Sequence, residues 1–144
     1  SGVAGVGNSY LVHTITEYLK RILKYPSQNL DQPSVLVTAS TGKAATGING
    51  TTLHFAFRLP VKSGYRCFEN WKPSDEALHI LRNKYKYLKV LLIDEISMVG
   101  CKTLQHLDKT LRCIKQNSSN FGQVSILAVG DFLQLPPVKE KNVF

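Results

Sequence analysis

The sequence predicts an α/β fold in which a parallel sheet is flanked by helices. Three short apolar runs, rich in β-branched residues, have the length and composition of strands buried on both faces: residues 35–39, 90–93 and 124–129. The segments between these runs carry apolar residues at helical spacing. Each run also ends in small polar or charged residues, and ligands of open α/β sheets bind at the carboxyl ends of the strands. We therefore expect a functional site at this edge.

Length and charge narrow the class of protein further. The 144 residues suffice for one domain with its own core, and 18 Lys and Arg against 10 Asp and Glu give a net charge of +8. This excess favours a polyanionic partner such as nucleic acid, although a basic protein without such a partner stays an alternative.

The three cysteines lack metal-ligand spacing, so we expect no zinc site and a reducing, intracellular compartment. No membrane span or signal peptide is apparent, and because the chain begins at Ser1 we expect a fragment of a longer protein.

The first nine residues, SGVAGVGNS, approach a phosphate-binding loop. Gly2, Gly7 and Ser9 fall on the glycine and hydroxyl positions of the pattern G-x-x-x-x-G-K-[ST], and an amphipathic helix over residues 9–24 follows. Glycines let backbone N–H groups converge on phosphate oxygens, next to the positive end of that helix. Asn8 stands where the pattern requires lysine, so it can donate a neutral hydrogen bond but supplies no cation. An ordinary glycine-rich turn is the alternative interpretation.

The run at residues 35–39 leads into Ser40 and Thr41 and then into a predicted helical turn whose N–H groups face an anion. Thr52, His54 and Phe55 follow closely. A hydroxyl, an imidazole and an aromatic ring suit phosphate contact and base stacking. From the residues alone, however, His54 is better interpreted as a core histidine.

The central run ends in Asp94 and Glu95. Their place at the carboxyl end of a strand favours a role in ligand chemistry, and a solvated acidic turn is an equally good interpretation. Ser74, followed by two acids, predicts a helix start, and Trp71 is expected to anchor the preceding loop. An apolar stripe predicts a core helix over about residues 100–116. After the third run, two prolines stiffen the segment that holds Gln134 near the same edge.

Five segments together carry a family resemblance: GVAGVGNS, TASTGKAA, TTLHFAF, IDEISMV and GDFLQLPPV. In this order and spacing they resemble the first motor domain of the Pif (petite integration frequency) helicases of superfamily 1B, which include relatives in Helitron transposons. The resemblance implies a RecA-like P-loop NTPase motor domain that uses ATP and Mg²⁺ and moves on single-stranded DNA. It also implies that residues 124–129 lie beside residues 90–93, which lie beside residues 35–39, with an exposed edge where a first strand is missing.

The resemblance assigns a role to each matching position. Gly2, Gly5 and Gly7 would shape the phosphate loop, with Asn8 at the lysine position. Ser9 and Asp94 would ligate Mg²⁺, Glu95 would orient and deprotonate the attacking water, and Gln134 would sense the γ-phosphate. The single-strand path would be lined by Thr41, Thr52 and His54.

The function implied is that of an ATP-dependent 5'-to-3' DNA helicase in DNA repair, recombination or telomere maintenance. We expect residues 1–144 to be one partial motor domain without the second motor, monomeric, with no inferred protein partner or membrane, in the nucleus or alternatively the mitochondrion. A catalytically inactive, transposon-derived copy that only binds single-stranded DNA is the alternative, and Asn8 favours it. Another kind of P-loop ATPase is disfavoured by the segment GDFLQLPP.

Overall fold

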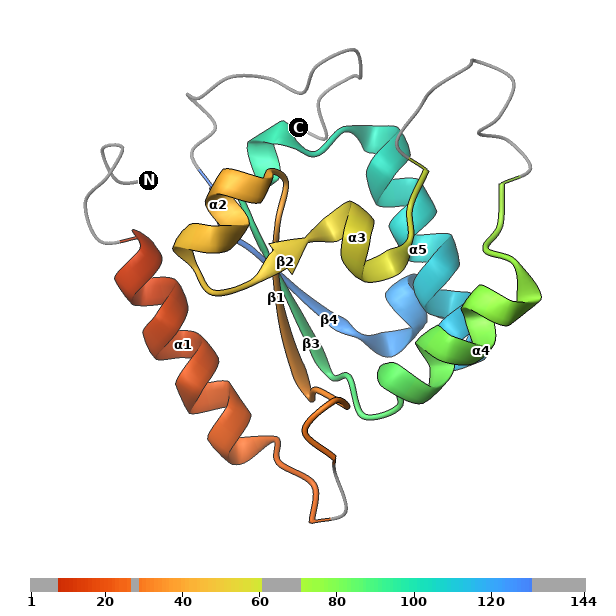
Figure 1. Cartoon of the computed structure of the whole chain (residues 1–144), viewed down its shortest axis with the longest axis horizontal. Helices are drawn as coiled ribbons and strands as arrows, with labels where there is room; N and C mark the ends of the chain where they lie inside the picture. The colour runs from red at the N-terminus through yellow and green to blue at the C-terminus, as the bar shows by residue number, and fades with distance from the viewer. Residues whose placement is uncertain (1–7, 27–28, 61–70, 131–144) are drawn as a thin grey trace.

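A single parallel sheet of four strands forms the centre of the fold (Figure 1). The computed structural model describes residues 8–26, 29–60 and 71–130. The strands are β1 (Val35–Ala39), β2 (Thr51–Thr52), β3 (Val90–Asp94) and β4 (Ser125–Ala128), in the spatial order β2-β1-β3-β4. On β3, Leu92 pairs with Val37 of β1 on one side and with Leu127 of β4 on the other. The predicted order of the three long strands is confirmed, and β4 forms one edge of the described sheet.

Helices cover both faces of this sheet. Helices α1 (Asn8–Ile22) and α2 (Gly42–Gly47) pack on one face, and α3 (Leu53–Phe57), α4 (Asp75–Lys84) and α5 (Cys101–Lys115) pack on the other. Alternate residues of β3 serve the two cores, because Leu91 and Ile93 join the larger cluster and Leu92 joins the smaller one. The prediction that this strand is buried on both faces is therefore confirmed.

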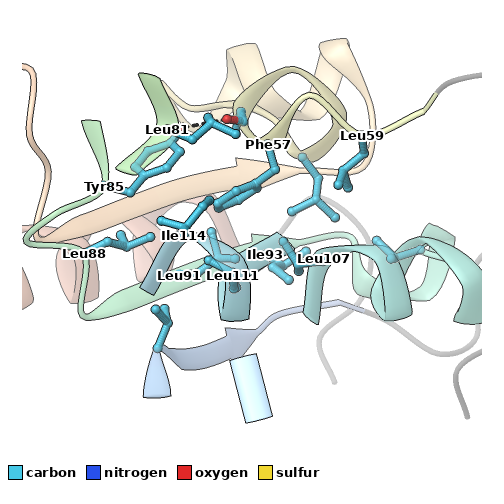
Figure 2. Packing of buried hydrophobic residues seen from close by; sticks show 14 of the residues in the cluster. Phe57, Leu59, Leu81, Tyr85, Leu88, Leu91, Ile93, Leu107, Leu111 and Ile114 are labelled. Carbon is cyan, nitrogen blue, oxygen red and sulfur yellow. Dashed lines mark hydrogen bonds between the residues drawn. The ribbon is translucent and has the colours of Figure 1, made fainter. Parts of the chain in front are cut away.

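The larger core contains a buried aromatic pair, which fixes α3 against α4 (Figure 2). The rings of Phe57 and Tyr85 lie 5.1 Å apart, and the Tyr85 hydroxyl donates a hydrogen bond of 2.8 Å to the carbonyl of Ala56. Burial raises the pKa of Tyr85 to about 12, so this hydroxyl keeps its proton and stays a donor. Trp71 packs against the same core, with its ring edge-on to His106 at 5.3 Å, as the predicted anchor requires.

Helix α4 begins where the sequence predicts. The Ser74 hydroxyl accepts a hydrogen bond of 3.2 Å from the N–H of Ala77 and so satisfies one of the unpaired donors of the first turn. The core stripe of α5 is also confirmed, since Leu107, Leu111 and Ile114 are buried. Within the described ranges, no helix is both long enough and apolar enough to cross a lipid bilayer.

Candidate functional site

The carboxyl ends of β1 and β3 lie side by side. Ala39, the last residue of β1, pairs with Asp94, the last residue of β3. Ser40 and Glu95 therefore follow directly from adjacent strand ends, one on each strand. This arrangement confirms that the two carboxylates lie at the sheet edge where ligands of α/β proteins bind.

Glu95 joins the end of β3 to the short 3-10 helix Ile96–Met98. Its backbone is left-handed, with φ 53° and ψ 45°, a conformation that costs a non-glycine residue roughly 1–2 kcal/mol. Two hydrogen bonds secure this turn: the N–H of Ile96 donates to the carbonyl of Val129 at 3.0 Å, and the N–H of Met98 donates to the carbonyl of Glu95 at 3.0 Å. A strained residue that its neighbours hold firmly is typical of functional sites.

The Glu95 carboxylate accepts two hydrogen bonds from the end of β1. The hydroxyls of Ser40 and Thr41 donate to the same oxygen, Oε2, at 3.1 and 3.2 Å. Thr41 is also the N-cap of α2, where its Oγ1 accepts from the N–H of Ala44 at 3.2 Å. Two residues with different predicted roles, Glu95 in water activation and Thr41 on the DNA path, are thus in direct contact. Sequence reasoning did not identify Ser40 as part of the site.

Asp94 has one carboxylate oxygen engaged and one available. Its Oδ1 accepts a hydrogen bond of 2.9 Å from the N–H of Glu95, and Oδ2 has no hydrogen-bond partner among the described residues. Burial raises the pKa of Asp94, the hydrogen bond from Glu95 opposes this, and the negative charge of Glu95 adds to it. Mg²⁺ prefers oxygen ligands and favours the charged form of a carboxylate, so the half-buried Asp94 fits a magnesium site.

The remaining predicted residues lie on helix α1, on strand β2 and on helix α3, or outside the described ranges. Ser9 is exposed in the first turn of α1, which runs against the direction of β1 with that turn toward the carboxyl ends of the strands (Figure 1). Thr52 caps α3 by accepting a hydrogen bond of 3.3 Å from the N–H of Phe55, whose own side chain is exposed. His54 is half-buried within α3. Asn8 is the first residue of α1. Four predicted residues lie outside the described ranges: Gly2, Gly5, Gly7 and Gln134.

The chain is similar to known helicases over nearly its whole length. The family model described as PIF1-like helicase matches residues 1–143. The chain is 35% identical over 142 residues to "ATP-dependent DNA helicase RRM3" of Saccharomyces cerevisiae, a match that covers 99% of this chain and 18% of that protein. The chain thus spans about a fifth of the length of that curated relative.

Solved structures agree with the sequence match. Unliganded Pif1 from Bacteroides superposes with a TM-score of 0.72 at 30% identity, over 99% of this chain and 29% of that one. Bacteroides Pif1 helicase in complex with ADP-AlF3 and ssDNA gives a TM-score of 0.65 at 34% identity, over 96% of this chain and 29% of that one. The four-stranded parallel sheet with its flanking helices is that of a RecA-like motor domain. The chain belongs to the PIF1-like helicase family.

Proposed function

We propose that this chain is one motor domain of an ATP-dependent DNA helicase, which couples ATP hydrolysis to movement on single-stranded DNA. The observation that carries the proposal is the pair Asp94 and Glu95 at the carboxyl end of β3, in hydrogen-bond contact with the end of β1. A relative with the name of an ATP-dependent DNA helicase and a similar structure with ADP-AlF3 and ssDNA support it. Residues 1–144 would form a single partial domain, and the second motor would lie elsewhere in the whole protein.

Each acidic residue has a separate task in the proposed hydrolysis. Glu95 orients the attacking water and accepts its proton. Its carboxylate can serve as this base because it is half-buried at the strand end and its backbone is held in a fixed turn. Asp94 and Ser9 would hold Mg²⁺, which when bound neutralises charge that develops on the transferred phosphoryl group. Backbone N–H groups at Gly2, Gly5 and Gly7 would bind the phosphates, and Gln134 would sense the loss of the γ-phosphate.

Thr41, Thr52 and His54 would contact the single strand. Thr41 and Thr52 cap neighbouring short helices, α2 and α3, which follow β1 and β2 at one end of the sheet. The exposed ring of Phe55 lies next to His54 in the chain and offers a surface for stacking. We further propose 5'-to-3' movement, action in repair, recombination or telomere maintenance, and a monomer in the nucleus, or alternatively in the mitochondrion.

Asn8 favours a second candidate function, a catalytically inactive copy that retains only single-strand binding. The family pattern has lysine at this position, where a cation binds the β- and γ-phosphates. An asparagine there offers a neutral donor, so the basic half of the nucleotide site is weakened while the acidic half is retained.

A DNA-stimulated ATPase assay on the full-length protein tests the proposal. We expect hydrolysis to rise when oligothymidine is added, and Glu95→Gln to lower it about 100-fold or more, because general-base catalysis contributes roughly 10²–10⁴-fold. Binding of oligothymidine without measurable hydrolysis by the wild type would establish the second candidate instead, and a gain of hydrolysis in Asn8→Lys would assign the loss to Asn8. Wild-type hydrolysis by Glu95→Gln would exclude the proposed base.

A further inference from the structure

The hydrogen bonds between the end of β1 and Glu95 all reach one of the two oxygens of the Glu95 carboxylate. Both hydroxyls, from Ser40 and Thr41, approach the same carboxylate oxygen, Oε2, at 3.1 and 3.2 Å. An ionised carboxylate only accepts hydrogen bonds, so each hydroxyl must direct its single proton at Glu95. The residue proposed as the catalytic base is therefore held by two donors in this structure.

Thr41 has no second proton to give. Its Oγ1 accepts a hydrogen bond from the N–H of Ala44 and donates one to Glu95. The bond to Glu95 uses the only O–H of the Thr41 side chain. A phosphate oxygen of DNA is also an acceptor and needs a donor. The Thr41 hydroxyl consequently cannot hold Glu95 and donate to a phosphate at the same time.

We propose that Thr41 is a positioning residue that holds Glu95 away from the attacking water until single-stranded DNA binds. When DNA binds, a phosphate oxygen accepts the hydrogen bond from the Thr41 hydroxyl. Glu95 then loses one of its two donors, and its carboxylate rotates toward the water. Ser40 is the second holding group and sets how firmly Glu95 is held without DNA. No covalent bond changes, since one hydrogen bond replaces another. The inference rests on the DNA contact of Thr41 and the catalytic role of Glu95 proposed above.

The surrounding backbone restricts this motion to side chains. The strand ends are joined by the pairing of Ala39 with Asp94 and by a buried hydrogen bond of 2.9 Å from the Thr38 hydroxyl to the carbonyl of Leu92. Beyond the strand, Ile96 is bonded to Val129. The side chains of Ser40, Thr41 and Glu95 are all only half-buried, so a phosphate can reach the hydroxyls and a rotamer change can release the carboxylate.

The exchange of partners makes DNA binding and release of Glu95 reciprocal. If DNA must remove the Thr41 hydroxyl from Glu95, then removal of the Glu95 side chain must strengthen DNA binding through Thr41. This consequence can be measured without nucleotide, so it does not depend on whether the protein with Asn8 hydrolyses ATP.

The test is a double-mutant cycle on the full-length protein, with affinity for fluorescein-labelled oligothymidine read by anisotropy in the absence of nucleotide. We expect Glu95→Ala to tighten binding about fivefold, at the lower end of typical coupling between sites. Asp94→Asn is the matched control for lost negative charge, because Asn keeps an oxygen for the N–H of Glu95. In the Thr41→Val background, Glu95→Ala should tighten binding no more than Asp94→Asn does.

Thr41→Ser covers the case in which Thr41→Val disturbs α2, because it keeps both the cap and the hydroxyl. It should retain the full effect of Glu95→Ala. Equal effects of Glu95→Ala and Asp94→Asn, in a protein that binds DNA, would refute the exchange and leave the helicase function standing. Absence of oligothymidine binding in every variant would instead refute the proposed function, and this inference with it.

Discussion

Asn8 is the residue that separates the two candidate functions, and its replacement is our first prediction. Asn8→Lys restores the cation of the phosphate-binding pattern at the first residue of α1. We expect DNA-stimulated ATP hydrolysis by the full-length protein to rise about tenfold or more, because hydrogen bonds to charged groups contribute roughly 1.5–3 kcal/mol. The measurement is kcat/KM for ATP at saturating oligothymidine.

Gln105→Lys provides the matched control for Asn8→Lys. Gln105 is exposed on α5, so the variant adds the same charge at a surface position and leaves the sequence of the proposed phosphate loop unchanged. It should leave kcat/KM unchanged. If Asn8→Lys also leaves kcat/KM unchanged, the missing cation does not limit hydrolysis.

Asp94 gives a second prediction, on stability and pH. Its pKa is raised above the ordinary value of 3.8 by burial, so the folded chain keeps this proton to a higher pH than the unfolded chain. Protonation therefore stabilises the fold, and the contribution of Asp94 to stability falls as pH rises through the interval between 3.8 and the raised pKa. We expect Asp94→Asn to have a higher Tm than the wild type at pH 7, with the difference shrinking toward acid.

The Tm of Asp94→Asn is measured by calorimetry from pH 4 to pH 8, with Mg²⁺ and ADP as the second variable. Addition of both should raise the Tm of the wild type more than that of Asp94→Asn, since ligands that bind the folded state stabilise it. A lower Tm for Asp94→Asn at pH 7 would show that the carboxylate stabilises the fold rather than serving a ligand at a cost in stability.

At the scale of elements, the strand β2 depends on one glycine, and this yields a third prediction. A Cβ on Gly50 would lie 2.7 Å from the carbonyl oxygen of Val37, so only glycine allows the chain to approach β1 closely before Thr51 pairs with Thr38. We expect Gly50→Ala to displace β2 and to destabilise the fold by about 1–3 kcal/mol, the usual cost of overpacking. The free energy of unfolding is measured in urea.

Gly47→Ala is the control for Gly50→Ala, because a Cβ at Gly47 meets no atom within 4 Å. It lies in α2 and should be neutral or slightly stabilising. Gly50→Ala should also weaken binding of oligothymidine, since β2 carries Thr52, the cap of α3. Wild-type affinity in a folded Gly50→Ala protein would contradict the assignment of Thr52 to the DNA path.

Local signals explain which elements the sequence could predict. Ser74 with its two following acids marks the start of α4, and an apolar stripe marks α5, because caps and periodicity act within a few residues. The two-residue strand β2 offered no such signal. Its pairing depends on the approach of Gly50 to β1, which is a tertiary contact.

At the scale of the whole molecule, the site also has a part that a local sequence pattern predicts and a part that only the tertiary structure decides. The placement of Asp94 and Glu95 at the carboxyl edge followed from a buried apolar run that ends in acids, a pattern visible in sequence. The contact of Glu95 with Ser40 and Thr41 was not predictable, because it requires the register between β1 and β3 and the left-handed backbone of Glu95. Pattern identifies the residues of the edge, whereas register decides which of them touch.

The net charge of the whole chain leads to the last prediction, on how a protein containing this domain binds DNA. Eighteen Lys and Arg against 10 Asp and Glu give +8, so neutralised phosphates should supply much of the affinity for single strands. With three to five phosphate contacts assumed, the slope of log K against log salt should lie at about −2 to −3.5, since single strands give roughly −0.7 per contact. The measurement is anisotropy of labelled oligothymidine over roughly 50–200 mM KCl, a range in which affinity that depends on phosphate contacts falls steeply. His54→Ala should weaken binding and leave this slope nearly unchanged if the ring contacts a base, or reduce it if the ring contacts a phosphate.

An oligomer of the same bases on an uncharged backbone should bind weakly and without salt dependence. Equal affinity for the charged and uncharged oligomers would exclude phosphate contacts as the basis of binding, and with them the DNA path over α2 and α3.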